Sequence, residues 1–175
     1  MKKAKIIHFG DPVLRQKAEP VKVFHKKLHA VVDTIKNTLL DTDYAAALAA
    51  NQVSILKSIT VIDYCDEYFE MINPEIIASS GESTGFEGCL SLPGYSGKVK
   101  RAENVTVKYQ DRHGKENTIE RGGAMARCIQ HELDHLNGIL YIDRMVEDFV
   151  THDDKGTKLS VKDLQRLTAA GGDPQ

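Results

Sequence analysis

The sequence lacks the long apolar runs that membrane proteins require. In 175 residues no tract approaches the roughly 20 apolar residues of a membrane-spanning helix. Residues 1–7 also lack the apolar region of a secretory signal peptide. We therefore expect a cytoplasmic protein that does not bind membranes.

Charge of either sign is not in excess. The 23 basic and 25 acidic residues give a formal net charge of −2. A protein whose main task is to neutralise nucleic-acid phosphates carries a marked positive excess. The balance therefore argues against a DNA-binding protein.

Cysteine is scarce as well. Cys65, Cys89 and Cys128 are odd in number and widely spaced. Disulfide frameworks use an even set of cysteines in an oxidising compartment. We interpret the three residues as free thiols or metal ligands.

What the sequence does contain is His131-Glu132-Leu133-Asp134-His135, an HExxH motif. Two histidines four residues apart on a helix lie on one face. Both can bind one divalent metal while Glu132 reaches a water molecule at that metal. Because four fixed positions also occur by chance, a surface helix with two spare histidines stays open as the alternative.

Periodicity places this motif on a helix within a mixed fold. Apolar residues at helical spacing predict a helix over about 25–41, and Asp11-Pro12 begins a short helical turn. We expect the motif helix over about 124–137, ended by Gly138, and a last helix from Ser160, a candidate cap, to Gly171-Gly172. The segments expected to be strands are 58–62, 69–72, 105–109 and 116–120, the last two joined by a turn at 112–114.

This order predicts an α+β fold, in which short antiparallel strands pack around a central helix carrying HExxH, with a C-terminal helix. No repeat or linker divides the chain, and its length is typical of one domain. We expect a single catalytic domain over residues 1–175, with about 171–175 as a flexible tail.

A catalytic site of the zinc type needs a third protein ligand. One protease class has a third histidine six residues after the second, but that position is Tyr141. Another uses a downstream glutamate, and Glu147 and Asp148 stand too close to the helix end to fold back. Cys128 to His135 would span about 10 Å along one helix, too far for tetrahedral geometry. Of the other two cysteines, Cys65 has no partner in sequence, whereas Cys89 stands in the glycine-rich segment 85–94.

Three motifs then resemble those of the peptide deformylase family. Glu87-Gly88-Cys89-Leu90-Ser91 matches its E-G-C-L-S motif, and residues 130–135 match Q-H-E-x-D-H. Residues 45–52 match G-x-G-L-A-A-x-Q at Leu48, Ala49, Ala50 and Gln52. The motifs stand in the family's order and spacing, so the resemblance covers about residues 1–165.

The resemblance implies removal of the formyl group from the N-terminal formyl-methionine of nascent bacterial or organellar polypeptides. Cys89, His131 and His135 would hold one divalent metal, with water as the fourth ligand. A bound cation lowers the pKa of water and so supplies a hydroxide nucleophile. Glu132 would take the water's proton and deliver it to the leaving amine.

By the same resemblance, the oxyanion would be stabilised by the Gln52 side-chain amide and the backbone N–H of Leu90. For Glu87 we expect a supporting role, paired with an arginine such as Arg101. A Cys/His/His set suits several metals. The family resemblance points to Fe(II), with zinc, nickel or cobalt as substitutes.

The sequence departs from the first family motif, because Ala45 and Ala47 stand where the family has glycine. The family's bound peptide runs along this segment like an added strand, so Ala45, Ala46 and Ala47 are candidate substrate-binding residues. If either position needed a positive φ, alanine would cost about 1 kcal/mol or more. If neither did, alanine would stiffen the segment.

The pocket for the methionine side chain would use Ala124, Arg127 and Cys128 beside Ala46, with Gly88 letting the backbone pass close to a neighbour. The small residues predict a wider pocket, and the Arg127 stem could pack while its charge stays at the rim. We therefore hypothesise altered side-chain preference with the chemistry retained.

Lys158, Lys162 and Arg166 recur at four-residue spacing and predict a basic stripe on the last helix. In some relatives such a helix docks on the ribosome, so a weak contact with ribosomal RNA is one interpretation. An ordinary solvated surface is the simpler one.

Two other functions stay open. An HExxH endopeptidase is disfavoured by Tyr141 and by the segment around Cys89. A catalytically silent protein that binds formylated chains is motivated only by the alanines at 45–47.

Overall fold

The computed structural model describes residues 2–169. Its α-helices are α1 (Lys26–Leu40), α2 (Gly123–Leu136) and α3 (Val161–Ala169). Its strands are β1 (Ala47–Ala49), β2 (Ile59–Tyr64), β3 (Glu67–Ser80), β4 (Ser83–Cys89), β5 (Leu92–Arg101), β6 (Asn104–Gln110), β7 (Glu116–Gly122), β8 (Phe149–His152) and β9 (Lys158–Ser160). The expected end of the last helix at Gly171-Gly172 and the expected flexible tail at 171–175 lie outside the described residues.

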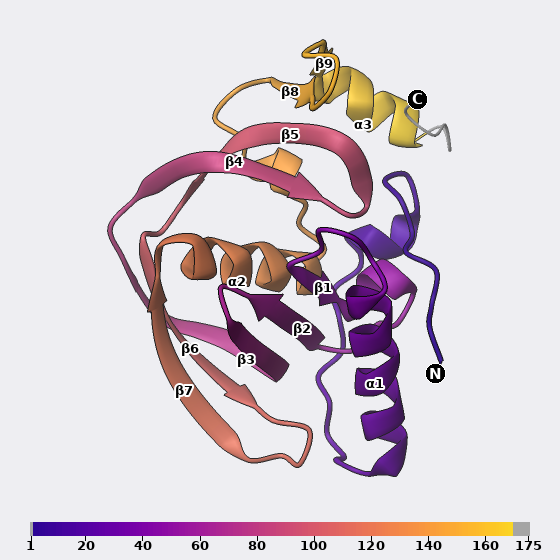
Figure 1. The fold of residues 1–175 in the computed structure, drawn as a ribbon, viewed down its shortest axis with the longest axis vertical. Helices are drawn as coiled ribbons and strands as arrows, with labels where there is room; N and C mark the ends of the chain where they lie inside the picture. Colours follow the sequence, from indigo (N-terminus) through magenta and orange to yellow (C-terminus); the bar gives the residue numbers. More distant parts are fainter. Residues whose placement is uncertain (1, 170–175) are drawn as a thin grey trace.

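The strands form two antiparallel sheets. One has five strands in the order β1-β2-β3-β6-β7, and the other has four in the order β4-β5-β8-β9. Helix α2 lies between them, while α1 packs beside β1 and β2 and α3 follows β9 at the C-terminal end (Figure 1). The expected combination of helices, antiparallel strands and a C-terminal helix is confirmed.

Helix α1 forms where the apolar spacing predicts it. The helix buries one stripe, Leu28, Val32, Ile35 and Leu39, against the apolar residues of β1 and β2. The His25 ring caps its first turn by accepting a hydrogen bond from the backbone N–H of Leu28 at 3.2 Å. This packing fixes β1, which leads into the candidate site.

Helix α2 is bounded by glycines at both ends. Gly123 begins it with a φ of 58°, and Gly138 follows it with a φ of 71°. A Cβ at Gly138 would lie 2.4 Å from the carbonyl oxygen of Arg15. Glycine is therefore required there both by the left-handed backbone and by the close approach of another segment. The expected end of the motif helix before Gly138 is confirmed.

Several strands are longer than expected or were not expected at all. Segment 69–72 is only part of the 14-residue β3, whose register shifts between Ile72 and Glu75. An Asn73-Pro74 pair stands at this shift and interrupts the sequence pattern. The strands β4 and β5 escaped detection because their four glycines, at 85, 88, 94 and 97, are typical of turns.

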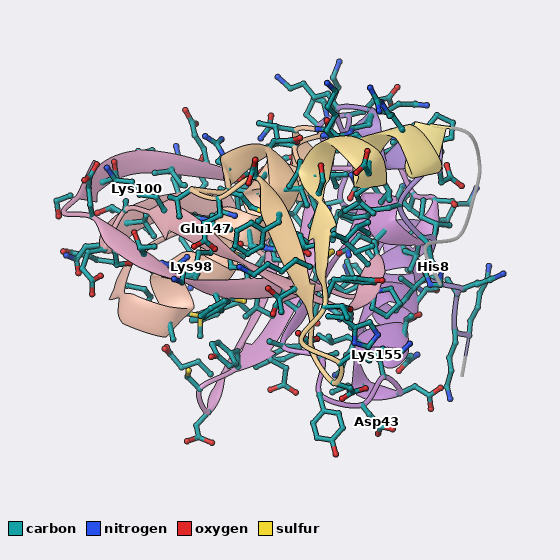
Figure 2. The ribbon with its side chains drawn as sticks, turned by 90° about the horizontal axis from the view of Figure 1, so that it is seen from above. His8, Asp43, Lys98, Lys100, Glu147 and Lys155 are labelled. Carbon is teal, nitrogen blue, oxygen red and sulfur yellow. The ribbon has the colours of Figure 1, made fainter. Side chains whose placement is uncertain are left out.

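The outer face of the four-stranded sheet is charged. Along β5, Lys98 and Lys100 point outward and flank Val99, which is fully buried beneath. Figure 2 looks onto this face, where Lys98 lies beside Glu147 with a nitrogen–oxygen distance of 3.6 Å. This alternation directs the apolar side of the sheet toward α2.

The C-terminal segment differs in part from its prediction. The Ser160 hydroxyl accepts a hydrogen bond from the backbone N–H of Asp163 at 3.4 Å, at the start of α3. Lys158 is not on that helix: it belongs to β9, and its ammonium group lies 3.8 Å from the centroid of the Phe149 ring. The basic stripe on α3 is thereby reduced to Lys162 and Arg166. Within residues 2–169, no helix is long and apolar enough to span a membrane.

Candidate metal and active site

Helix α2 presents both motif histidines on one face. The ring centroids of His131 and His135 lie 5.0 Å apart. His135 is buried, while His131 keeps a small exposed fraction. The i and i+4 spacing therefore delivers two imidazoles to the same place, as expected from the sequence.

Cys89 reaches the same place from the end of β4. The register of β4 and β5 shifts between Gly88 and Cys89, because Gly88 pairs with Ser96 and Cys89 with Leu92. Such a bulge redirects the side chain that follows it. As a result the Cys89 Sγ lies 3.3 Å from the Nε2 of His135.

The ligand atoms of Cys89, His131 and His135 all lie within 4.8 Å of one another. A tetrahedral site with ordinary metal–sulfur and metal–nitrogen bonds separates those two atom types by about 3.6 Å. The distance between Cys89 and His135 is close to that value. The thiolate and imidazole set therefore fits a divalent transition metal.

A buried ion-pair network holds His131. Its Nδ1–H donates to Glu87 Oε2 at 2.8 Å. Arg101 donates to both carboxylate oxygens of Glu87 at 2.9 Å, and Arg127 donates to Oε1 at 2.9 Å. The expected pairing of Glu87 with Arg101 is confirmed. With Nδ1 held in this way, the Nε2 lone pair of His131 is available to a metal.

The charges of this network shift two pKa values. Burial opposes ionisation of Glu87, but hydrogen bonds from Arg101 and His131 outweigh it and lower the pKa of Glu87 to about 2. Burial also disfavours a charged His131, yet its hydrogen bonds with Cys89 and Glu87 raise the pKa of that ring to about 10. Without a metal, Glu87 is therefore ionised and the His131 ring is protonated, and a metal that binds Nε2 would displace that proton.

The network continues away from the site through Asp134. This carboxylate accepts a hydrogen bond from Arg101 and two from Arg144, the latter at 2.9 Å each. Asp134 and Arg101 are both buried. The chain of ion pairs ties α2 to β5 and to the segment after α2.

Glu132 is buried next to the histidines. Its Oε2 accepts a hydrogen bond of 3.4 Å from the Thr60 hydroxyl on β2. Burial raises the pKa of Glu132 to about 7, although His131 and Thr60 act in the opposite direction. Burial and repulsion from His131 hold the pKa of His135 well below its ordinary value, so this ring is neutral.

Gln52 points its amide group toward the cysteine. Its Oε1 accepts from the backbone N–H of Ala49 at 3.0 Å, which fixes the orientation of the amide. Its Nε2 lies 3.5 Å from Cys89 Sγ and 3.1 Å from the Ser91 hydroxyl. Leu90 opens the short turn between β4 and β5, directly after Cys89. Both expected oxyanion donors thus lie next to the candidate ligands.

The segment with the unexpected alanines is unstrained. Positive φ values occur at Tyr44 and Ser54 on either side, whereas Ala45, Ala46 and Ala47 have none. Alanine therefore carries no left-handed penalty here. Among the strands that the structure describes, β1 lies at the edge of the five-stranded sheet and pairs with β2, so its other side pairs with no strand of that sheet.

Arg127 lies elsewhere than the sequence suggested. Its guanidinium does not remain at an exposed rim. It donates to Glu87, to the Val99 carbonyl oxygen at 2.9 Å and to Ser83 on β4. Because Arg127 is half-buried beside an acceptor-rich strand, its charge is used inside the protein. A Cβ at Gly85 would lie 3.3 Å from this guanidinium.

The other candidate pocket residues occupy less constrained positions. Ala124 is exposed in the first turn of α2, and Cys128 is half-buried beside the apolar residues of the five-stranded sheet. Cys128 is not part of the metal-ligand group. A Cβ at Gly88 would meet only the Tyr95 carbonyl oxygen at 3.5 Å, an ordinary contact. No neighbour within residues 2–169 therefore requires glycine at position 88.

Comparison with known proteins agrees with this geometry. The family model of polypeptide deformylases matches residues 3–149. The chain belongs to the polypeptide deformylase family. It is 44% identical to the peptide deformylase of Thermoanaerobacter pseudethanolicus over 146 residues, which are 83% of this chain and 91% of that protein. It is 49% identical to the peptide deformylase of Halothermothrix orenii over 139 residues, 78% of this chain and 90% of that protein.

Solved deformylase structures share the fold. The enzyme from Thermotoga maritima superposes with a TM-score of 0.81 at 38% identity, covering 84% of this chain and all of that one. The Synechococcus elongatus enzyme, solved in complex with actinonin, gives a TM-score of 0.79 at 39% identity over 82% of this chain and 79% of that one. Deformylases are metal-dependent hydrolases that remove the N-formyl group from nascent polypeptides, and this is the activity of the chain.

Sequence reasoning missed several residues around the site. Asp134 and Ser91 stand within the deformylase motifs, so the sequence marked their positions. The motifs alone did not indicate what either residue does. Thr60 and Asn51 carried none, because each is an ordinary polar residue until folding brings it against Glu132 or His135.

Proposed function

We propose that Cys89, His131 and His135 hold one divalent metal and that Glu132 acts as the general base and acid of the deformylation. The observation that carries this proposal is the convergence of the three ligand atoms within 4.8 Å, with the Glu132 carboxylate buried beside them. When bound, the metal polarises water and lowers its pKa, which makes water a nucleophile near neutral pH.

Glu132 removes the proton from the attacking water and then donates it to the leaving amine. The Thr60 hydroxyl, 3.4 Å from Oε2, orients the carboxylate for this transfer. Burial keeps bulk water away from Glu132, so the proton passes between the carboxylate and the reacting atoms.

The oxyanion that develops on the formyl group is stabilised by the Gln52 amide and by the backbone N–H of Leu90. This assignment is supported by the fixed orientation of Gln52, whose Oε1 is engaged by Ala49 while its Nε2 faces Cys89. Preorganised donors of this kind need no rearrangement as charge develops.

The formylated peptide binds as an extended strand along the free edge of β1, beside Ala45, Ala46 and Ala47. Ala46, Ala124 and Cys128 border the pocket for the first side chain, and the Arg127 stem closes it from the β4 side. Gly88 leaves room for the peptide rather than for another part of the chain. The small residues are expected to accept formyl-leucine and formyl-norleucine as well as formyl-methionine.

The native metal is Fe(II) in this proposal, with zinc, nickel or cobalt able to replace it. A ligand set of one thiolate and two imidazoles suits all four metals, and the preference for iron rests on the family. An oxidisable metal next to a thiolate predicts loss of activity in air.

The test is formate release by protein purified anaerobically and loaded with iron. The Glu132→Gln variant should bind the metal equally and lose about 10²–10⁴ in kcat. Cys89→Ser should lose the metal itself. An iron-loaded sample that releases no formate, or a fully active Glu132→Gln variant, would contradict the proposal.

The described chain is proposed to act as one catalytic domain in a bacterial-type cytoplasm, where formylated nascent chains are made. A weak contact between α3 and ribosomal RNA is favoured only by the exposed Lys162 and Arg166. Reversal of both charges should abolish salt-sensitive co-sedimentation with ribosomes and leave kcat unchanged. Equal sedimentation of the variant would show that these side chains are merely solvated.

A further inference from the structure

Among residues 2–169, two buried side-chain atoms have no hydrogen-bond partner: the Oδ1 of Asn51 and the Nδ1 of His135. Both residues are almost completely buried, with exposed fractions of 0% and 1%. Buried polar atoms in native proteins are nearly always hydrogen-bonded, so each orphan calls for a physical explanation.

The two unpaired atoms belong to residues that contact each other. The Nδ2 of Asn51 donates to the backbone carbonyl oxygen of His135 at 2.5 Å. This contact fixes the amide, because the reverse orientation would set two oxygen atoms against each other. Oδ1 is therefore the atom left over, and it can only accept a hydrogen bond.

The orphan on His135 is a donor. Its Nε2 faces the Cys89 Sγ at 3.3 Å, on the side of the ligand group. A neutral imidazole that offers the Nε2 lone pair to a metal carries its hydrogen on Nδ1. Histidines that bind metals almost always donate this other N–H to an acceptor. The site therefore holds one unmatched donor and one unmatched acceptor on adjacent residues.

We propose that Asn51 is the positioning residue of His135, and that its Oδ1 accepts the Nδ1–H of the ring through one enclosed water molecule, because the two buried atoms do not bond each other directly. The inference rests on the proposed ligand set. Asn51 would then be the neutral counterpart of Glu87, a residue of the four-stranded sheet whose carboxylate accepts a hydrogen bond from the Nδ1–H of His131. Asn51 stands in the one-turn 3-10 helix Ala50–Val53, so the segment that supplies Gln52 also supports a ligand.

A neutral partner fits the charge of this region. Glu132 is already buried near by, and the hydrogen bonds of Arg101 and Arg127 on this side of the helix go to Glu87 and not to His135. A second carboxylate without such cations would be an unpaired buried charge. An amide supplies the acceptor without that charge.

The proposal is tested by the zinc affinity of three variants, measured by competition with a chelator after the native metal is removed. Asn51→Leu has nearly the same size but no acceptor, and its Kd for zinc should rise about 10–100-fold. Asn51→Thr places an uncharged hydroxyl at the same position, which can donate to the His135 carbonyl oxygen and accept a hydrogen bond, and it should recover much of the affinity. Recovery by threonine separates the acceptor role from a loss of packing.

Asn73→Ala is the matched control for stability. This amide makes three hydrogen bonds of 2.8–2.9 Å to Val21 and Gln110, none of them to a residue of the site. Its loss should lower the thermal midpoint and leave the zinc Kd within twofold of the parent value. A rise in Kd equal to that of Asn51→Leu would overturn the proposal, because it would mean that any loss of stability weakens the metal.

The second measurement is nitrogen NMR of the histidine rings in the zinc-loaded protein. The Nδ1–H of His135 should give a slowly exchanging proton in the parent and in Asn51→Thr, but not in Asn51→Leu. This signal can be read in the parent even if Asn51→Leu does not fold, and a rapidly exchanging Nδ1–H there would overturn the proposal. A parent protein that binds no zinc would instead count against the ligand set itself.

Discussion

The two histidines of α2 are four residues apart, yet the two sheets support them in opposite ways. On the side of the four-stranded sheet, His131 meets the carboxylate of Glu87, which is bound by Arg101 and Arg127. On the side of the five-stranded sheet, the supporting hydrogen bonds come from neutral groups: the Asn51 amide donates to the backbone carbonyl oxygen of His135, and the Thr60 hydroxyl donates to Glu132.

The difference shows which task each kind of group performs. Buried charges are tolerated when each is paired with an opposite charge, and Glu87 is paired with two arginines. This network is therefore suited to holding β4, β5 and α2 together. Neutral donors and acceptors hold their positions without imposing a fixed charge. They suit the side where charge develops during the reaction.

The largest effect is expected from breaking the charged side. Glu87→Leu leaves Arg101 and Arg127 buried without their shared partner, and should lower the free energy of unfolding by about 3–5 kcal/mol. Chemical denaturation of the metal-free protein measures this loss without any contribution from the metal. A loss below about 1 kcal/mol would show that the network is solvated rather than buried.

The next effect is expected on the neutral side, and on rate instead of stability. Gln52→Leu removes one oxyanion donor and should lower kcat about a hundredfold or more, while the affinity for zinc stays the same. Steady-state kinetics and chelator competition on one preparation separate the two quantities. A weakened metal with an unchanged kcat would reverse the assignment.

A smaller effect is expected when the charged side keeps one of its arginines. Arg127→Met retains a long apolar stem and leaves Glu87 bound by Arg101. The loss in unfolding free energy should be about 1.5–3 kcal/mol, the range for hydrogen bonds to charged groups, because the bond to Glu87 is lost together with those to Val99 and Ser83. If Arg127→Met were as destabilising as Glu87→Leu, Arg101 would not suffice to neutralise the carboxylate.

The smallest effect is expected at Thr60. Its hydrogen bond to Glu132 is long, at 3.4 Å, so Thr60→Val should lower kcat only about fivefold, which corresponds to about 1 kcal/mol. The comparison of kcat with KM is informative, because a carboxylate that is merely less well oriented affects kcat alone. A change in KM of the same size would indicate that β2 itself has moved.

Local patterns predicted the parts of the fold that carry a clear period. Helix α1, the end of the motif helix at Gly138 and the paired strands β6 and β7 follow from apolar spacing and glycines. The strands β4 and β5 did not, although they carry Glu87 and Cys89. Their glycines weaken any strand signal, and pairing across the register shift at Gly88 and Cys89 is a tertiary event.

The sequence by itself determined the chemistry of the site. The motifs HExxH, E-G-C-L-S and the segment ending at Gln52 resemble those of the deformylase family, to which the chain belongs, and they supply the thiol, imidazoles, carboxylate and amide that the proposed site uses. Helical spacing alone sets His131 and His135 on one face.

Only the tertiary structure decided which residues support those groups by hydrogen bonds and ion pairs. It directed Arg127 to Glu87 rather than to a pocket rim, and it set Asn51 against His135. Neither contact has a sequence signature, because each joins segments more than 30 residues apart whose meeting depends on how both sheets pack on α2. The physical reason is that ligand identity is a property of single side chains, whereas support of a ligand depends on neighbours that only packing supplies.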